Sequence, residues 1–333
     1  MQAFAGSGNR HHLAPHARRV EIVSGQHTAT GTGRIAATVI AAATAMATTF
    51  AAPAEGATSD LAAGTFSVLT YNVAGLPEPL SSSKPATNTK LISARLNAYD
   101  IVNVQEDFAY HPDLIKHDEH PFRTPPSAPV WAPGVPFSDG LNTLSDFELA
   151  KLDRVTWNRC TKTNCLTPKG FTYVRLRLHG GAALDLYNAH MNAGSGAEEQ
   201  LRVRRDNMAQ LSGYIKKHSA GRAVIVMGDT NSRYTRSGDS IRRLRDDNDL
   251  TDAWVQLEKG GKTPDRQDNV PTCKDANGCE LVDKILYRSG LDLRLDATSY
   301  NNERERFLDS KGEPLSDHNP SSVRFSFRIP QEP

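Results

Sequence analysis

Polar residues with oxygen-bearing or imidazole side chains recur in this sequence at the ends of short apolar runs or within them. They are Asn72, Glu106, Asp107, His190, Asn192, Asp229, Asn231, Asp283, Asp317 and His318. A structural role explains any one of them as well, because Asx side chains often close turns at strand ends. Together they supply carboxylates, amide oxygens and two imidazoles, the groups that a hard divalent cation and acid–base chemistry require.

This set of side chains predicts metal-assisted acid–base chemistry. Mg²⁺ prefers oxygen ligands and keeps several water molecules, so one or two carboxylates can hold it. Such a cation can neutralise an anionic substrate, and a histidine with a pKa of about 6.5 can accept a proton from water at neutral pH. Residues 58–333 contain no HExxH, Gly-rich phosphate loop or GxSxG sequence, which argues against a zinc protease, a P-loop NTPase and an α/β-hydrolase.

The elements that must position these residues are mostly strands. Apolar runs, several of them alternating with a period of two residues, predict strands at 66–71, 101–104, 173–178, 184–187, 223–227, 281–287 and 323–327. Apolar residues at helical spacing predict helices at 89–99 and 197–217. Strands with helices between some of them indicate an α+β sandwich, in which two packed sheets are flanked by helices.

The first 57 residues differ in composition from the rest of the chain. An uncharged run rich in Ala and Thr at 35–52 follows Arg34, and small residues come after it, a pattern typical of a secretory signal peptide. A membrane anchor is the alternative, for which the run is short. We predict a signal peptide with a long N-terminal extension at 1–57, a single domain at 58–333, and a secreted, extracellular protein.

Charge and cysteine content narrow the function further. Residues 58–333 carry a net charge of −1, which argues against a pure nucleic-acid binder but not against a nuclease, because a bound metal supplies positive charge locally. The four cysteines of the chain allow three pairings, and their short spacings favour Cys160–Cys165 and Cys273–Cys279. Two disulfides agree with export.

Six short sequences occur in a set order: LTYNV at 69–73, VQE at 104–106, NAHMN at 188–192, MGDTN at 227–231, VDKI at 282–285 and SDHNP at 316–320. In this order they resemble the endonuclease/exonuclease/phosphatase superfamily, whose fold is that of DNase I. Within it, the chain is similar to secreted bacterial and fungal members, including neutral sphingomyelinase-like phosphodiesterases. The resemblance implies a four-layer α+β sandwich of two mainly antiparallel sheets flanked by helices.

The resemblance also implies a metal site. Glu106 would be the main ligand, with Asn72 and Asp317 near the same ion or the phosphate. Asp229 and Asn231 would hold the phosphate, the attacking water or a second ion. The implied cofactor is Mg²⁺, with Mn²⁺ or Ca²⁺ as alternatives.

The remaining matching residues would carry the acid–base chemistry. His318 resembles the base that activates water, Asp283 the carboxylate that orients it, and His190 the group that stabilises or protonates the leaving oxygen. No acid that would orient His190 is evident. Asp146 stands where many relatives have a basic residue, so a phosphate or substrate contact could be lost there. Asp107 could hold the residues that bind the metal or substrate in place, but the favoured interpretation is that it is a surface charge.

Two further segments have an open role. The Pro-rich segment 121–137 excludes a regular strand or helix, and its Trp131 and Phe137 either contact a lipid surface or pack onto the body, which we favour. Arg233 and Arg236 follow the MGDTN sequence, and the sequence favours neither phosphate binding by these arginines nor its absence. Residues 242–245 alternate with acidic neighbours and are predicted to face solvent.

The main hypothesis is therefore a secreted, Mg²⁺-dependent phosphodiesterase that acts on a phospholipid head group such as that of sphingomyelin. A secreted nuclease of the same fold is the alternative, and a non-catalytic binding protein is a third. The expected partner is a phospholipid or nucleic-acid phosphodiester, with transient contact with a membrane surface, and the protein is expected to be a monomer.

Overall fold

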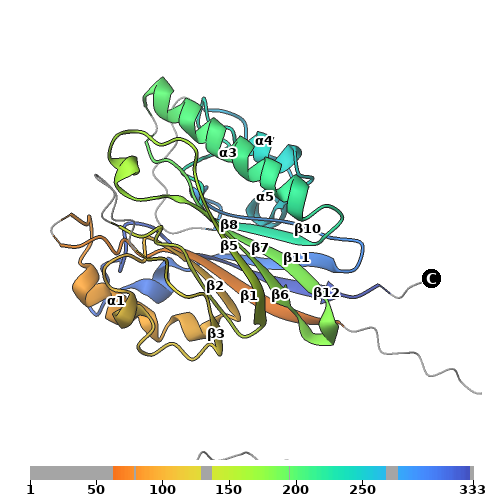
Figure 1. Cartoon of the computed structure of the whole chain (residues 1–333), viewed down its shortest axis with the longest axis horizontal. Coiled ribbons are helices and arrows are strands. Elements are labelled where there is room, and N and C mark those ends of the chain that lie inside the picture. The colour runs from red at the N-terminus through yellow and green to blue at the C-terminus, as the bar shows by residue number, and fades with distance from the viewer. Residues whose placement is uncertain (1–62, 79, 129–136, 195, 268–276, 331–333) are drawn as a thin grey trace, which may run out of the picture. The chain divides into compact units, whose positions relative to one another are not determined.

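The computed structural model describes residues 63–78, 80–128, 137–194, 196–267 and 277–330 (Figure 1). The predicted signal peptide, Trp131 and Cys273 lie outside these ranges. Within them, no helix is both long enough and apolar enough to cross a membrane.

Two six-stranded sheets form the centre of the fold. The first has the strand order β11-β12-β1-β2-β4-β3, made of Arg294–Asn302, Ser321–Arg328, Ala63–Asn72, Ile101–Gln105, Asn142–Ser145 and Phe122–Arg123. The second has the order β5-β6-β7-β8-β10-β9, made of Glu148–Thr156, Gly170–Arg177, Ala183–His190, Val224–Asp229, Asp283–Arg288 and Thr251–Asp252. All strand pairs are antiparallel except β1 with β2 and β7 with β8.

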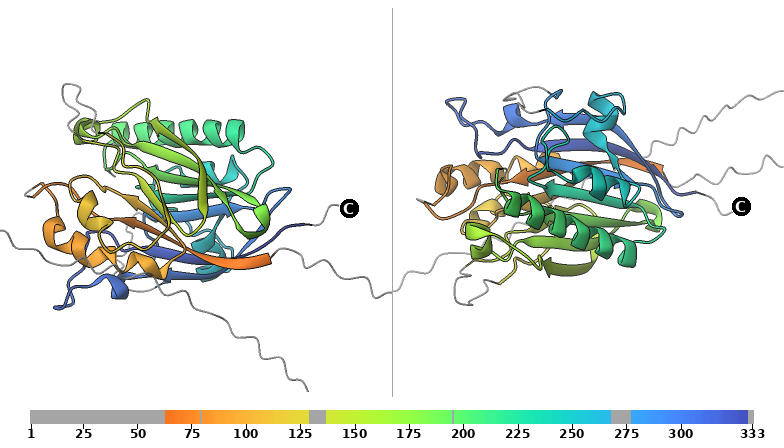
Figure 2. Two further views of the ribbon diagram at one scale, coloured as in Figure 1. Left: turned by 60° about the horizontal axis from the view of Figure 1, so that its bottom comes forward. Right: turned by 90° about the horizontal axis from the view of Figure 1, so that it is seen from above.

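Helices cover the outer faces of the two sheets. The longest, α3 (Glu198–His218), lies with α4 (Ile241–Asp246) and α5 (Ala253–Glu258) over the sheet that contains β8, whereas α1 (Pro85–Ser93) lies on the opposite side of the molecule (Figures 1 and 2). The short helix α2 (His111–Leu114) and the 3₁₀ turns η1 to η4 complete the connections, at Leu96–Ala98, Lys162–Leu166, His179–Gly181 and Arg304–Phe307. The arrangement is the predicted four-layer α+β sandwich.

Apolar side chains from both sheets fill the space between them, and a polar seam crosses this core. The side-chain nitrogen of Gln105 donates to Asn188 Oδ1 at 2.8 Å, and Asn188 Nδ2 donates to Val104 O at 2.9 Å. All three groups are buried. Because an unpaired buried amide costs about 1–3 kcal/mol, these bonds fix how β2 lies on β7, close to the ends of both strands.

The seven predicted strands and the helix at 197–217 are present, with boundaries shifted by a few residues. The helix predicted at 89–99 was wrong in extent: α1 begins at Pro85, a residue favoured in the first turn, and ends at Ser93. Beyond it, the Asn97 side chain bonds the backbone of His117 and Glu119, which competes with continued helix.

The strands β5 and β11 were not predicted, for a physical reason. Both lie at sheet edges and carry many exposed polar side chains, so their sequences lack a clear apolar pattern. The prediction that the segment 121–137 contains no regular strand was also wrong at its start. Phe122 and Arg123 precede the prolines at 125 and 126 and pair with β4 as the short strand β3.

The first predicted disulfide is confirmed. Cys160 and Cys165 are bonded and close a loop of sequence separation 5 that contains most of η2. The loop is tied to the end of β7, because Asn192 Oδ1 accepts from the backbone nitrogen of Thr161 at 2.9 Å. Asn192 therefore has a structural contact, whereas the preceding His190 belongs to the cluster described next.

Candidate active site

Strand direction brings the predicted site residues to one edge of both sheets. The strands β1 and β2 run parallel, so Asn72 at the end of β1 lies beside Gln105, and Glu106 follows immediately. The strands β7 and β8 are also parallel and end side by side at His190 and Asp229. Because the two sheets are packed face to face, these four strand ends form one cluster.

Two antiparallel neighbours add the remaining groups. Asp283 begins β10 and lies directly opposite Asp229. The segment before β12 reaches the same edge because β12 runs antiparallel to β1, and Ser316 Oγ donates to Asn72 O at 2.6 Å. His318 follows two residues later, and its backbone nitrogen donates to Ser316 Oγ at 3.2 Å.

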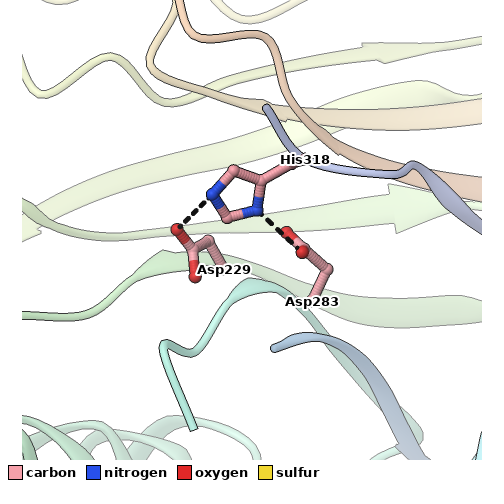
Figure 3. A group of neighbouring side chains, drawn as sticks. All are labelled: Asp229, Asp283 and His318. Atoms are coloured by element: carbon pink, nitrogen blue, oxygen red, sulfur yellow. Dashed lines mark hydrogen bonds and ion pairs between the residues drawn. The ribbon is translucent and has the colours of Figure 1, made fainter. Parts of the chain in front are cut away.

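His318 lies between two carboxylates (Figure 3). Its Nδ1 is 2.9 Å from Asp283 Oδ2, and its Nε2 is 3.7 Å from Asp229 Oδ2. One potential ligand atom from each of these three residues lies within 4.8 Å of the others. With Nδ1 donating to Asp283, Nε2 faces the cluster, which is the orientation that a base acting on water requires once this nitrogen has lost its proton.

Burial and charge shift the pKa values of this group in different directions. Burial alone would lower the pKa of His318, but the carboxylates of Asp283 and Asp229 outweigh it and raise the pKa well above its usual value. Burial raises the pKa of Asp283. Burial alone would also raise the pKa of Asp229. The nearby His318, His190 and Lys169 outweigh burial and hold that pKa well below the usual range.

The residues predicted to hold a cation gather around Asn72. Its Nδ2 lies 3.3 Å from Glu106 Oε1 and 3.2 Å from Asp229 Oδ2. Both carboxylates thus converge on one amide group, and the buried Asp283 Oδ1 has no hydrogen-bond partner among the described residues. Such converging, partly unsatisfied oxygens suit a hard divalent cation, so the donor set fits Mg²⁺.

The backbone of this site adopts conformations that non-glycine residues rarely take. Glu106 and Asn231 have φ values of +57° and +50°. Gly228, before Asp229, has φ +148°, and a β-carbon there would lie 2.0 Å from Ala189 O. Such conformations persist where the surrounding structure holds them, and they are typical of functional sites.

Lys169 belongs to the cluster and was missed by the sequence reasoning. Its Nζ lies 2.9 Å from His190 Nε2, which in turn lies 3.3 Å from Asp229 Oδ2 and 3.8 Å from Glu106 Oε1. Burial lowers the pKa of Lys169, while Glu106 and Asp229 oppose that shift. Lys169 precedes β6 in a polar stretch, where its type and spacing give no indication of a site.

No acid among the residues that the structure describes orients His190 through its other ring nitrogen. Its Nδ1 is buried without a hydrogen-bond partner among the described residues, and its backbone oxygen accepts from Trp157 Nε1 at 2.7 Å. Packing and the contact with Lys169 therefore hold this ring in place.

Two predicted residues lie at the margin of the cluster. Asn231 donates through its backbone nitrogen to Asp229 Oδ1 at 2.9 Å, and its Nδ2 donates to Met191 O at 3.2 Å. Asp317 has an exposed side chain whose Oδ2 accepts from the hydroxyl of Ser82. No contact between Asp317 and Glu106 is found among the described residues.

Two interpretations of acidic residues were wrong. Asp107 is buried, not a surface charge, and its Oδ2 lies 2.5 Å from His111 Nδ1 and 2.7 Å from Asn142 Nδ2. Asp146 lies at the opposite end of the sheet, because β4 runs antiparallel to β2 and the Asp146 backbone nitrogen donates to Asp100 O. The Asp146 position therefore cannot remove a substrate contact at this site.

The arginines after β8 mostly hold loops together. Arg236 Nε donates to Asp239 Oδ2 at 2.6 Å, and the Arg233 backbone nitrogen donates to the same oxygen. Arg243 is exposed as predicted, but Arg242 and Arg245 are partly buried against the segment at 263–264, which corrects that part of the prediction. None of the Arg236 contacts found among the described residues involves the cluster carboxylates.

Comparison with known proteins agrees with this arrangement. Residues 86–277 match the model of Endonuclease/Exonuclease/phosphatase family 2. Proteins named sphingomyelinase from Mycobacterium bovis and Mycobacterium tuberculosis are 53% identical over 273 residues, which cover 81% of this chain and 54% of theirs. The chain thus spans about half the length of these curated relatives.

Solved structures share the fold at low sequence identity. A beta toxin from Staphylococcus aureus with bound magnesium ions is 13% identical with a TM-score of 0.55, covering 78% of this chain and 99% of that one. TDP2 from D. rerio, complexed with a single-strand DNA product, is 18% identical with a TM-score of 0.57, covering 79% and 99%. The matched family model, the DNase I-like sandwich and the site at its strand ends lead to one conclusion: the chain belongs to Endonuclease/Exonuclease/phosphatase family 2.

Proposed function

We propose that this protein is a divalent-metal-dependent phosphodiesterase that cleaves a phospholipid head group, in the manner of a sphingomyelinase. The observation that carries the proposal is the pairing of His318 with Asp283 at 2.9 Å, directly beside the converging carboxylates of Asp229 and Glu106. A base with an orienting acid lies next to a cation-binding donor set, and hydrolysis of a phosphate diester requires both.

Glu106, Asp229 and Asn72 would hold the cation, with Mg²⁺ the expected ion. The donor types agree with this choice, because Glu106 and Asp229 offer carboxylate oxygens. Asn72 would offer its Oδ1 after rotation of the amide, since here Oδ1 accepts from the Ala74 backbone nitrogen and Nδ2 faces the two carboxylates. When bound, the cation neutralises the phosphate charge and stabilises the transition state. Asp317 and Asn231 stay in the proposal as residues that would contact the phosphate or its bound water.

The protein's own groups would move the protons. His318 Nε2 takes a proton from the attacking water, and Asp283 keeps the ring in the required tautomer and stabilises the imidazolium that forms. On the other side of the cluster, the Lys169–His190 pair supplies a proton or positive charge to the leaving oxygen. Lys169 Nζ is 2.9 Å from His190 Nε2, so the two nitrogens can share one proton.

The substrate class rests on the curated relatives. Proteins named sphingomyelinase share 53% identity with this chain over 273 residues. Nuclease activity is the second candidate, since the fold of this chain is also that of TDP2 solved with a DNA product. The third hypothesis, a non-catalytic binding protein, is disfavoured because His190, His318 and the acidic residues are all in place.

We also propose that the protein is secreted and acts as a monomer outside the cell. The apolar run at 35–52 and the Cys160–Cys165 disulfide support export, because disulfides persist mainly in oxidising compartments.

One experiment tests the proposed function. Purified protein is assayed with Mg²⁺ on sphingomyelin, phosphatidylinositol phosphates, plasmid DNA and bis(p-nitrophenyl) phosphate, each with and without EDTA. We expect EDTA-sensitive release of the head group from sphingomyelin at the highest rate. Activity that survives EDTA would contradict the metal requirement, and preference for DNA with a steep fall in added salt would establish the nuclease alternative.

A further inference from the structure

A pocket of about 390 Å³ opens beside the candidate active site. Glu106 and Lys169 line it and belong to the catalytic cluster as well. Most of its remaining wall is apolar or uncharged, and consists of Leu76, Leu80, Phe108, Phe137, Thr163, Asn164, Leu166, Thr167 and Ala193. Lys169 is therefore the one basic group among the described residues of the pocket.

The pocket lies on a definite side of the cluster. In the second sheet the strand order is β6-β7-β8-β10, with Lys169 just before β6 and Asp283 on β10. In the first sheet the order is β12-β1-β2, with His318 before β12 and Glu106 after β2. The pocket thus borders the β6 and β2 side, opposite the His318–Asp283 pair.

This placement has a chemical consequence. In a displacement at phosphorus the attacking and leaving oxygens lie roughly in line, on opposite sides of the phosphorus atom. If His318 activates the water, the leaving oxygen faces His190 and Lys169, and the group attached to that oxygen extends into the pocket. A wall that is mainly apolar, with Glu106 and Lys169 as its only charged groups among the described residues, suits a hydrocarbon and does not suit a polynucleotide with several phosphates.

We infer that this pocket binds the apolar alcohol half of the substrate and that Leu80, Phe108 and Leu166 select for it. The inference rests on the proposed function. Water adds to phosphorus, the bond between phosphorus and the oxygen of the lipid alcohol breaks, and the proton from the Lys169–His190 side completes the released alcohol. The phosphate stays on the head group as a phosphomonoester.

Packing contacts hold the aromatic wall of the pocket in place. The Phe108 and Phe137 rings pack with their centroids 5.8 Å apart. Gly140, at φ +67°, lies against the Phe108 ring, and a β-carbon there would lie 2.5 Å from a ring atom. Leu80 and Leu166 line the pocket with 66% and 43% of their surfaces exposed, so a chain longer than the pocket would pass over them.

The test uses the double variant Leu80→Gln/Leu166→Gln. Both side chains are exposed, so the substitutions remove apolar surface without opening the core. Leu291→Gln is the matched control, because Leu291 is 80% exposed and lines a different pocket, at the opposite end of β10. The substrates are short-chain sphingomyelin and short-chain phosphatidylcholine, both kept monomeric, and bis(p-nitrophenyl) phosphate, whose leaving group is too short to reach the two leucines.

The measured quantity is the ratio of kcat/KM on the better short-chain lipid to kcat/KM on bis(p-nitrophenyl) phosphate. We expect this ratio to fall about tenfold in the double variant, as apolar contacts discriminate by about 10–200-fold per group, and to stay unchanged in Leu291→Gln. Mass spectrometry of the products should find phosphocholine and the lipid alcohol.

The outcomes separate the two proposals. No Mg²⁺-dependent hydrolysis of any substrate by the unsubstituted protein would overturn the proposed function. An active protein would overturn the pocket inference alone if its ratio is unchanged in the double variant, if it releases choline and leaves the phosphate on the lipid, or if it cleaves plasmid DNA faster than both lipids.

Discussion

Two histidine–aspartate pairs lie at opposite ends of β2, and they differ in how completely their atoms are bonded. His120 is buried, with Nδ1 bonded to Asp118 and Nε2 donating to Tyr99 O at 2.7 Å. Asp118 is bonded by Arg123 as well. At the other end of the strand, His318 is only partly buried, and its Nε2 lies 3.7 Å from Asp229 Oδ2.

The difference separates a structural pair from the pair that we propose to be catalytic. Both nitrogens of the His120 ring are bonded, so the ring holds β3, η1 and the start of β2 together. His318 has one nitrogen bonded to Asp283, and among the described residues no lysine or arginine forms an ion pair with Asp283 or Asp229. The same two residue types thus stabilise one end of the sandwich and form the proposed base at the other.

Removal of divalent cations gives the largest expected effect, and it should act only at the proposed active site, where β1, β2 and β8 end. With EDTA, activity should fall to background, because a cation contributes several kcal/mol of transition-state stabilisation, about a thousandfold or more in rate. Excess Mg²⁺ should restore it. A far-ultraviolet circular dichroism spectrum that changes on chelation would show instead that the metal holds the fold.

The substitution His318→Ala tests the catalytic pair. We expect kcat to fall about 10²–10⁴-fold with the circular dichroism spectrum unchanged, because the base is lost and the ring is a partly exposed side chain. The control is His120→Gln, described below. Full activity of His318→Ala on bis(p-nitrophenyl) phosphate would contradict the mechanism.

The substitution Lys169→Met should have the next largest effect on rate. The side chain keeps its length and loses its charge, so kcat should fall about 10²-fold, the range found when one donor to a developing oxyanion is removed. KM should change little, since the charge acts mainly in the transition state. A raised KM with unchanged kcat would mean that Lys169 only binds substrate.

The substitution His120→Gln should lower the stability of the protein and leave its activity nearly unchanged, the opposite of His318→Ala. We expect the free energy of unfolding to fall by about 3 kcal/mol, because a buried ion pair loses one partner, while kcat/KM stays within about twofold. Chemical denaturation with a parallel activity assay measures both. A large loss of activity in the folded variant would show that the two ends are coupled.

The stability contributed by His120 should also depend on pH. Burial alone would lower its pKa, but Asp118 and the Tyr99 carbonyl raise the pKa above the ordinary value of 6.5. A raised pKa in the folded state stabilises fully below the unfolded pKa, and this contribution disappears as pH rises through the folded value. The difference in melting temperature between the unsubstituted protein and His120→Gln should therefore shrink on the alkaline side. A difference in melting temperature that stays constant from pH 5 to 10 would contradict the raised pKa of His120.

The sequence by itself determined seven of the strands, the order of the site residues and the chemistry that their types allow. The runs before Asn72, Glu106 and Asp229 are local patterns of apolar residues, and these patterns follow from which side chains face the core. The resemblance of six short sequences to one superfamily assigned the fold, because those sequences lie at the strand ends where chemistry is concentrated.

Only the tertiary structure decided which of these groups meet. Strand pairing and direction place Asp146 at the far end, bury Asp107 against Asn142, and leave Asp317 exposed beside Ser82. The same long-range packing brings Lys169 to His190 from a polar stretch with no pattern of its own. Such contacts depend on the register between distant strands, and a local stretch of sequence carries no information about that register.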